Sequence, residues 1–296
     1  MLNTIQTKDS FDFKDVKEVG DDNYTDIIFS WYVTNRCQYK CSYCSSYAIN
    51  RESESNFKNY KLVLKRLSLI KFNFRIDIIG GEPTLHPNLI EILESLHSNE
   101  YCNDIYLFSN IKDIDKLKML KKLNLNKIIL IASFHQEYNN IDNFIEKIKQ
   151  IDLKLIVNVN ITDDSIFELL DKLIINDIDY SINPLEDHDN YTHINKHDVN
   201  RLEKYLNTQQ TIIYKAKNNF EFTPYEIKLN KLNRFKGWKC SPIMYEINSN
   251  GDIVNECTDK VLPFIPTKKD LYDKIICEQD CCECTAMYNI KKEFHE

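Results

Sequence analysis

Short apolar runs alternate with amphipathic segments between residues 26 and 182, and this alternation constrains the fold more than any other feature of the sequence. Leu89, Ile92, Leu93 and Leu96 illustrate the helical segments, because they recur at the spacing of one helix face. The expected strands are 26–33, 75–79, 105–108, 127–132, 154–159 and 178–182, and the expected helices are 58–71, 87–98, 113–123, 141–151 and 164–175. Short connections between them predict an α/β fold with parallel strands and right-handed crossovers. The pattern leaves open whether the sheet is open and twisted or a partial barrel.

Polar or small residues stand where the expected strands end. Both architectures bind ligands at the carboxyl ends of their parallel strands, so these positions are candidates for a binding site. The candidates are Asn35, Gly80–Glu82, Ser109, Asn110, Ser133, His135, Asn158, Asn160 and Asn183. The alternative for each of them is a residue that merely ends a strand.

Length and charge narrow the classes of protein that this chain can represent. Its 296 residues suffice for one large α/β domain with a smaller appendage. The 38 basic and 45 acidic residues include no basic block, which disfavours DNA or RNA as the main partner. The sequence has no apolar run long enough to cross a membrane, and its first residues lack the apolar stretch of a signal peptide. We therefore expect a cytoplasmic protein without a membrane partner.

Ten cysteines are many for a chain of this size, and nine of them fall into two groups. In a reducing compartment, clustered cysteines usually indicate metal or redox chemistry rather than disulfides. The first group is Cys37, Cys41 and Cys44, and the second is Cys240, Cys257, Cys277, Cys281, Cys282 and Cys284. Cys102 stands apart between an expected helix and strand, where a small core residue is the preferred interpretation.

The first group lies on the loop that leaves the first expected strand. The spacing CxxxCxxC lets one loop hold Cys37, Cys41 and Cys44 around a compact inorganic core. Three thiolates bind three irons of a [4Fe–4S] cluster and leave the fourth iron without a protein ligand. Catalytic metal sites keep such an open position, so the loop indicates a reaction at the metal. A zinc site is the alternative, although zinc sites usually close with a fourth Cys or His nearby.

A pair of glycines marks the end of the second expected strand. The whole chain has five glycines, and two of them, Gly80 and Gly81, are adjacent and precede Glu82. Glycine lets the backbone approach a ligand closely, and a carboxylate suits an ammonium group. The segment therefore predicts a ligand-binding turn, and a plain tight turn is the alternative.

Together these two motifs resemble the radical S-adenosylmethionine (radical SAM) superfamily. The resemblance rests on CxxxCxxC with an aromatic residue, Tyr43, before its last cysteine, and on the segment GGEPT that begins at Gly80. It implies a partial (β/α)6 TIM-like barrel over about residues 26–185. It also implies that SAM binds the open iron of a [4Fe–4S] cluster. An electron from the reduced cluster then cleaves SAM to methionine and a 5′-deoxyadenosyl radical, which abstracts hydrogen from a substrate.

The resemblance also implies roles for residues at the strand ends. The Gly80–Glu82 segment looks like the family motif that binds the SAM amino group. Ser133, with Asn158 or Asn160, resembles the contacts to the SAM carboxylate and ribose. A reductant such as flavodoxin or ferredoxin is the expected partner.

The second cysteine group flanks an expected hairpin. Asn250-Gly251 is a strong two-residue turn signal between the apolar runs 245–247 and 253–254. Such a hairpin would bring Cys240 and Cys257 together at its open end.

Four thiolates are enough to close a metal site in the C-terminal segment. The pair Cys281 and Cys284 has CxxC spacing and would complete a set with Cys240 and Cys257. This arrangement resembles the twitch unit of radical SAM enzymes, a shortened SPASM domain that binds one auxiliary [4Fe–4S] cluster. The resemblance implies a small cysteine-rich α+β domain at the C-terminus. Structural zinc is the alternative, and the choice of ligands among the last four cysteines stays open.

These inferences give a domain plan and a function as expectations. The plan comprises an N-terminal arm (1–25), the radical SAM partial barrel (26–185), a bridge or lid (186–235) and the auxiliary cluster domain (236–296). The expected function is net oxidation of a small molecule by radical SAM chemistry. His135 and Glu186 are candidates for the base that such an oxidation needs, and structural roles are the alternative for both. Modification of a peptide, including epimerisation, and a non-enzymatic zinc-bearing binding module are the alternative functions.

Overall fold

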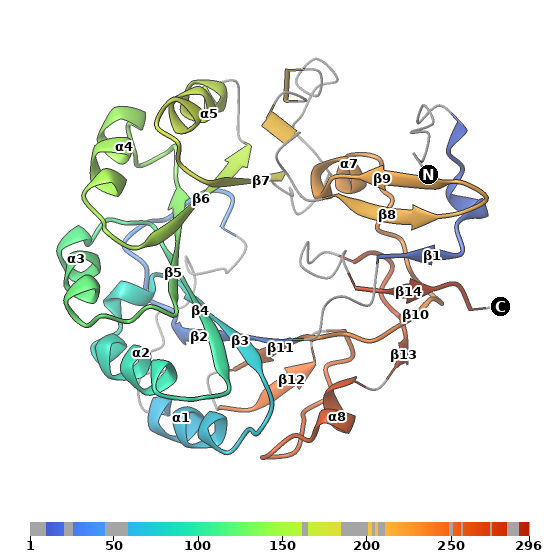
Figure 1. The fold of residues 1–296 in the computed structure, drawn as a ribbon, viewed down its shortest axis with the longest axis horizontal. Coiled ribbons are helices and arrows are strands. Elements are labelled where there is room, and N and C mark those ends of the chain that lie inside the picture. Colours follow the sequence, from blue (N-terminus) through green and yellow to red (C-terminus); the bar gives the residue numbers. More distant parts are fainter. Residues whose placement is uncertain are drawn as a thin grey trace.

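Two β-sheets and the helices around the larger one make up the described structure (Figure 1). The computed structural model describes residues 10–20, 26–44, 59–161, 165–184, 201–202, 205–206, 211–248, 251–255, 257–272, 274–282 and 290–295. Every expected strand and helix between residues 26 and 184 is present within a few residues of its expected bounds.

The larger sheet curves into a partial barrel. Its strands are β2 (Ile27–Thr34), β3 (Phe74–Gly80), β4 (Cys102–Ser109), β5 (Ile128–Phe134), β6 (Lys154–Ile161), β7 (Tyr180–Pro184), β11 (Met244–Ile247) and β12 (Ile253–Asn255). The strand order is β12-β11-β2-β3-β4-β5-β6-β7. All neighbours from β2 to β7 pair in parallel, which confirms the α/β fold and the partial barrel. The carboxyl ends of these strands therefore meet at one edge.

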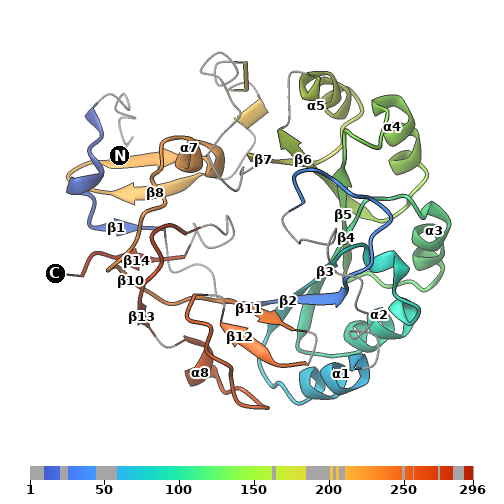
Figure 2. The ribbon, with the colours of Figure 1, turned by 180° about the vertical axis from the view of Figure 1, so that it is seen from behind.

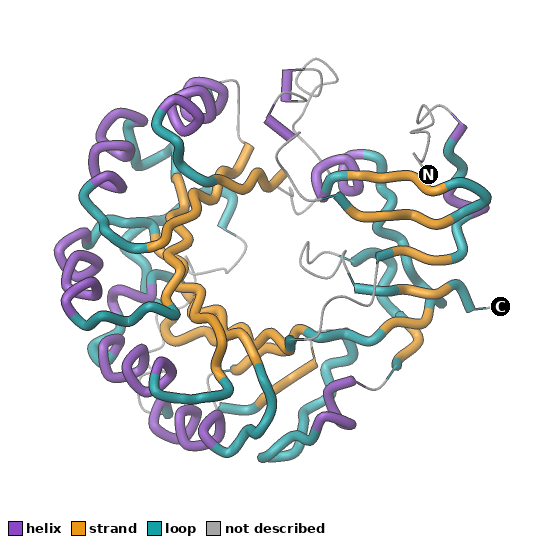
Figure 3. Tube along the Cα trace, in the orientation of Figure 1, coloured by secondary structure: helices purple, strands orange, loops and turns teal. Residues whose placement is uncertain are grey.

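Helices cover the outer, convex face of this sheet (Figure 3). They are α1 (Tyr60–Ser68), α2 (Leu89–His97), α3 (Ile114–Lys122), α4 (Ile141–Lys149) and α5 (Ile166–Ile175), with a short 3-10 turn, η5 (Pro83–Leu85), after β3. Strand side chains alternate between faces, so every second residue, such as Phe29, Ile76 and Leu107, joins the helices in the main core. The remaining strand residues face the concave side.

The expected hairpin forms, and it extends the barrel sheet. Strands β11 and β12 are antiparallel, and β11 pairs in parallel with β2, placing Met244 opposite Ile28. Arg66 of α1 fixes this addition, because its buried guanidinium donates to the carbonyl oxygens of Gly251 (2.6 Å) and Pro263 (2.5 Å). Charged groups are buried at low cost only when their donors are satisfied, so Arg66 is a structural residue.

The smaller sheet lies across the open side of the barrel (Figure 2). Its strands, in spatial order, are β13 (Ile275–Ile276), β10 (Lys239–Cys240), β14 (Lys292–Glu293), β1 (Glu18–Val19), β8 (Ile212–Lys215) and β9 (Asn219–Phe222). The further helices are η2 (Phe13–Asp15), α7 (Pro224–Leu229) and α8 (Lys268–Tyr272). The sheet thus takes strands from the expected arm, bridge and C-terminal segments. Their division into separate domains stays a prediction.

His86, at the end of η5, predicts a loss of stability in acid. Its side chain is fully buried, and burial together with Lys116 lowers the pKa of the imidazole to about 4. The unfolded chain binds a proton on this histidine below about pH 6.5, whereas the folded chain does not until about pH 4. Above about pH 6.5 this histidine does not change the free energy of unfolding. Between about pH 6.5 and pH 4 the free energy of unfolding falls as the pH drops, by on the order of 3 kcal/mol for this group.

Urea denaturation between pH 7.5 and 4.5 measures this loss. The His86→Asn variant keeps an acceptor for the Asn88 amide, which is 3.1 Å from the His86 Nδ1 atom, but does not titrate there. We expect the variant to be less stable at pH 7.5 and to lose less stability in acid. An equal acid loss in both proteins would contradict the assignment.

Among the described residues, no helix has the length and apolar character needed to span a membrane.

Candidate functional site

The three cysteines of the first group lie on the loop after β2, at the carboxyl edge of the barrel sheet. Cys41 is buried, and Cys37 and Cys44 are half-buried. The Cys44 amide donates to the Cys41 carbonyl oxygen at 3.2 Å, which closes a turn between these two cysteines. The loop therefore gathers three thiols at the edge where parallel sheets bind their ligands.

Polar groups approach the sulfur atoms of two of these cysteines. The Tyr39 amide and the Asn110 side-chain nitrogen lie 3.4 and 3.9 Å from Cys37 Sγ. His135 Nδ1 lies 3.3 Å from Cys41 Sγ. Burial raises the pKa of Cys37 and raises that of Cys41 to about 12, so these sulfurs become thiolates on binding a cation. Such surroundings suit the sulfur ligands of an iron–sulfur cluster, whose properties depend on hydrogen bonds to sulfur.

The connection between β5 and α4 holds the cysteine loop in place. The Lys40 amide donates to the Tyr138 hydroxyl at 2.9 Å, and the Tyr39 and Tyr138 rings stack with centroids 4.3 Å apart. Glu137 accepts from the Ser42 amide at 3.1 Å. Neither Glu137 nor Tyr138 was among the site residues expected from the sequence. Their position just after a strand end was the available signal.

His135 stands against the cysteine loop. Its Nδ1 atom contacts the Tyr43 hydroxyl at 3.2 Å in addition to Cys41, and its ring is parallel to that of Tyr43. Burial lowers the pKa of His135 to about 4, so the ring is neutral near pH 7. These contacts assign the imidazole a supporting role for the loop, and its expected role as a base stays a prediction. Glu186, the other candidate base, lies outside the described residues.

Gly80 and Gly81 let the end of β3 pack against the backbone that leads into the cysteine loop. A Cβ atom on Gly80 would lie 2.2 Å from the Thr34 carbonyl oxygen, and one on Gly81 would lie 2.2 Å from the Arg36 carbonyl oxygen. The glycine pair predicts close approach of the backbone to a ligand. The close approach in the structure is to the chain itself, although a ligand contact by this segment stays a prediction.

The Glu82 carboxylate is buried and saturated by protein donors. Its Oε1 atom accepts from the Thr84 amide (3.1 Å), the Thr84 hydroxyl (2.6 Å) and the Ser109 hydroxyl (2.9 Å). Its Oε2 atom accepts from the Asn110 amide at 2.7 Å. Burial raises the pKa of Glu82, and these donors oppose the rise. The carboxylate thus joins the ends of β3 and β4, and its expected contact with the SAM amino group stays a prediction.

The expected SAM contacts on β5 and β6 come together on the concave face. Ser133 pairs with Asn158, which pairs with Ser181 of β7, and Asn160 pairs with Asn183. Asn158 Oδ1 accepts from the side chains of Ser181 and Asn183. These half-buried groups form a polar strip at the carboxyl ends of three strands. Their contacts with SAM stay predictions.

The second cysteine group is spread over the smaller sheet and the loops beside it. Cys240 lies on β10, Cys257 follows β12, and Cys277 follows β13. Cys281 and Cys282 are half-buried, whereas Cys284 lies outside the described residues. Across the ranges given above, no three His, Cys, Asp or Glu side chains are close enough to share one metal ion. A [4Fe–4S] cluster spreads its thiolates over four irons, so it needs a wider arrangement than a single ion.

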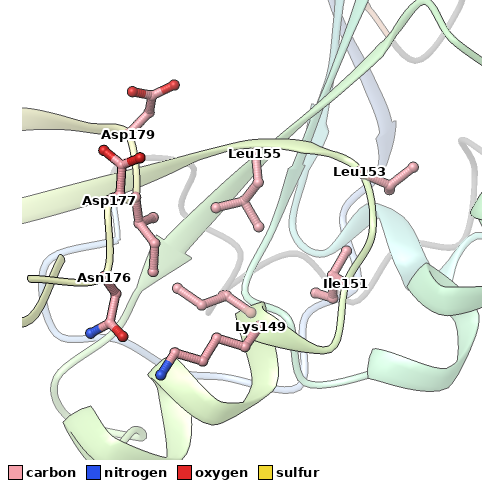
Figure 4. Close-up of a pocket in the computed structure, with 9 residues that line it drawn as sticks. Lys149, Ile151, Leu153, Leu155, Asn176, Asp177 and Asp179 are labelled. Atoms are coloured by element: carbon pink, nitrogen blue, oxygen red, sulfur yellow. The ribbon is translucent and has the colours of Figure 1, made fainter.

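A pocket of about 240 Å³ lies at the opposite edge of the barrel (Figure 4). It is lined by Ile148, Lys149, Ile151, Leu153, Leu155, Asn176, Asp177, Ile178 and Asp179. These residues precede or begin β6 and β7, whereas the cysteine loop meets the strands at their carboxyl ends. The pocket is therefore separate from the candidate site.

Comparison with known proteins agrees with the motifs. The family model described as the radical SAM superfamily matches residues 31–208. An uncharacterized protein of Methanocaldococcus jannaschii is 31% identical over 129 residues, which are 43% of this chain and 36% of that protein. A GTP 3′,8-cyclase of Pasteurella multocida is 27% identical over 147 residues, covering 44% of this chain and 43% of the cyclase. The matches thus span less than half the length of these curated relatives.

A solved structure shares the fold over more of the chain. Streptococcus suis SuiB, bound to the precursor peptide SuiA, superimposes with a TM-score of 0.55 and 21% identity. The similarity covers 84% of this chain and 65% of SuiB. At this identity the match concerns the fold alone.

Proposed function

Since this chain belongs to the radical SAM superfamily, we propose that it oxidises a substrate by hydrogen-atom abstraction at the carboxyl edge of its barrel. The observation that carries the proposal is the loop after β2, which brings Cys37, Cys41 and Cys44 to the same carboxyl edge of the sheet as the polar strip of β5–β7. Members of the superfamily bind a [4Fe–4S] cluster and SAM, and these three cysteines are the ligands that we assign to the cluster. When reduced by a flavodoxin or ferredoxin, the cluster supplies the electron that cleaves SAM to methionine and a 5′-deoxyadenosyl radical.

The residues of the site have three tasks in this proposal. The side-chain nitrogens of Asn110 and His135 contact the sulfur atoms of Cys37 and Cys41 and would form hydrogen bonds to their thiolates. The hydrogen bonds that Glu82 accepts from the end of β4 keep the ends of β3 and β4 in a fixed arrangement at the carboxyl edge. The side chains of Ser133 and of Asn158 or Asn160 would form hydrogen bonds with SAM and so orient it toward the substrate.

The C-terminal cysteines favour oxidation over other outcomes. After one hydrogen atom has left, the substrate radical must lose one electron and one proton to become an oxidised product. A second, fully ligated [4Fe–4S] cluster is a one-electron acceptor of adjustable potential. We therefore propose that the second cysteine group would hold an auxiliary cluster, which would supply a one-electron acceptor, and that the substrate is a small molecule such as an alcohol or amine.

Modification of a peptide is the second candidate, favoured by a specific observation. SuiB was solved with a precursor peptide bound, and the similarity of its fold extends over 84% of this chain. In a peptide epimerisation the substrate radical would regain a hydrogen atom rather than lose an electron.

Product stoichiometry separates the two candidates. With SAM, a reductant and candidate small molecules or peptides, oxidation is expected to yield one 5′-deoxyadenosine per product, and the product is lighter by two hydrogen atoms. Mass spectrometry in deuterated water is the measurement. A product of unchanged mass in ordinary water that carries one solvent deuterium would reject oxidation and support epimerisation.

A further inference from the structure

We infer that the auxiliary cluster is held by Cys240, Cys257, Cys277 and Cys282, and that Lys292 is its buried cationic partner. This inference rests on the proposed function, because it assigns the ligands of the proposed second cluster. It departs from the set expected from the sequence, in which Cys281 and Cys284 completed the site.

The register of the smaller sheet brings two of these thiols and the lysine to one face. Cys240 of β10 lies opposite Lys292 of β14. On its other side, β10 pairs with β13, where Lys239 lies opposite Ile276. The next pair along is Trp238 and Cys277, because the Cys277 amide donates to the Trp238 carbonyl oxygen at 2.8 Å. Paired residues of antiparallel strands share a face, as do residues two apart on one strand. Cys240, Cys277 and Lys292 therefore project from the same face.

This face is the buried one. The relative exposures of Cys240, Cys277 and Lys292 are 6%, 8% and 2%. Ile276, which alternates with Cys277 along the strand, is 44% exposed. The alternation shows that the thiols and the ammonium group share the protein interior, away from bulk water.

Cys282 and Cys257 reach this interior from two loops. Asn233 clamps the backbone of Cys282, whose amide donates to the Asn233 carbonyl oxygen (2.8 Å) and whose carbonyl accepts from the Asn233 side chain (2.9 Å). Cys282 packs against both hydrophobic cores, and Cys257 packs against the main one. Lys292 lies within electrostatic range of the sulfur atoms of all four cysteines, and Cys240 lies within that range of Cys277 and Cys282.

Charge explains why a lysine is found among these thiols. Its Nζ atom donates to the Ile290 carbonyl oxygen at 3.0 Å and lies 4.9 Å from the centre of the Phe235 ring. Burying an ammonium group is costly unless an anion compensates it. Four thiolates around a [4Fe–4S] core carry net negative charge, so cluster and lysine stabilise each other. A nearby cation also favours the reduced cluster, which raises its reduction potential and suits an electron acceptor.

Iron content tests the ligand set. The background is the full chain with Cys37, Cys41 and Cys44 replaced by alanine, so that all remaining iron belongs to the second site. In anaerobically reconstituted protein we expect Cys277→Ser and Cys282→Ser each to lose most of this iron. The matched controls Cys281→Ser and Cys284→Ser are expected to keep it, with circular dichroism confirming that all four variants fold.

The opposite pattern, with iron lost from the two controls and kept in the other two variants, would overturn the ligand set and leave the auxiliary cluster intact. Background protein that binds no iron would overturn both the ligand set and the auxiliary cluster of the proposed function.

A redox titration followed by electron paramagnetic resonance tests the lysine. In the same background, Lys292→Met is expected to keep its iron and to shift the midpoint potential of the second cluster downward, and Lys292→Arg is expected to restore it. A midpoint that is equal in all three proteins would reject the electrostatic role of Lys292.

Discussion

Replacing Cys37, Cys41 and Cys44 together by alanine is expected to remove about four irons per chain and to abolish formation of 5′-deoxyadenosine from SAM. The three thiols lie on one loop, and no protein ligand for the fourth iron is assigned, so the cluster has no other anchor once they are gone. Iron of the second site should stay, because none of its assigned ligands lies on the cysteine loop: three belong to the smaller sheet and its loops, and Cys257 follows β12. Iron and sulfide analysis and chromatography of the SAM products with dithionite as reductant measure both effects.

Cys102→Ala is the matched control for this triple variant. Cys102 begins β4, is fully buried as expected of a core residue, and belongs to neither group. Its replacement removes one sulfur atom from the core without touching the cysteine loop, so iron content and SAM cleavage should equal those of the unaltered protein. A triple variant that still forms 5′-deoxyadenosine would refute the assignment of the loop.

The barrel could be predicted from the sequence because its elements carry their own periodicity. Leu89, Ile92, Leu93 and Leu96 are all buried on one face of α2, and the strands β2–β7 are apolar runs between turn signals. The smaller sheet could not be predicted. Strands such as β1 (Glu18–Val19) and β14 (Lys292–Glu293) have two residues each, which is too short for a pattern, and they meet only through long-range pairing.

The candidate site was predictable in its motifs and unpredictable in its contacts. Three cysteines with fixed spacing identify their chemistry locally. The hydrogen bond from the Lys40 amide to the Tyr138 hydroxyl joins residues 98 positions apart, and the position of Tyr138 after a strand end does not identify its partner. Glu82 shows the same limit: the motif indicated a carboxylate near a ligand, but it could not show that Ser109 and Asn110 of the next strand end donate to that carboxylate.

The Gly81→Val variant is expected to lose most iron of the first site as well as SAM binding. A Cβ atom at this position would lie 2.2 Å from the Arg36 carbonyl oxygen and 2.8 Å from that of Asn35, and both atoms are backbone. The chain leading into Cys37 would have to move, and the bond from the Glu82 amide to the Arg36 carbonyl oxygen (2.7 Å) would break. Overpacking of this kind costs about 3 kcal/mol or more.

Iron content, SAM affinity of the reconstituted protein and thermal denaturation together decide what Gly81 does. Gly237→Ala is the control, because Gly237 has a φ of +82° with no atom within 4 Å of an added Cβ. That variant carries the backbone penalty of about 1–2 kcal/mol without a collision, and its first cluster should assemble normally.

If Gly81→Val assembles the cluster fully, keeps its stability and binds SAM weakly, the glycine serves a ligand's approach, and the packing role argued from Arg36 is wrong. If iron and stability fall together, Gly81 is the contact that lets β3 support the cysteine loop, and weak SAM binding follows from the loss of the cluster.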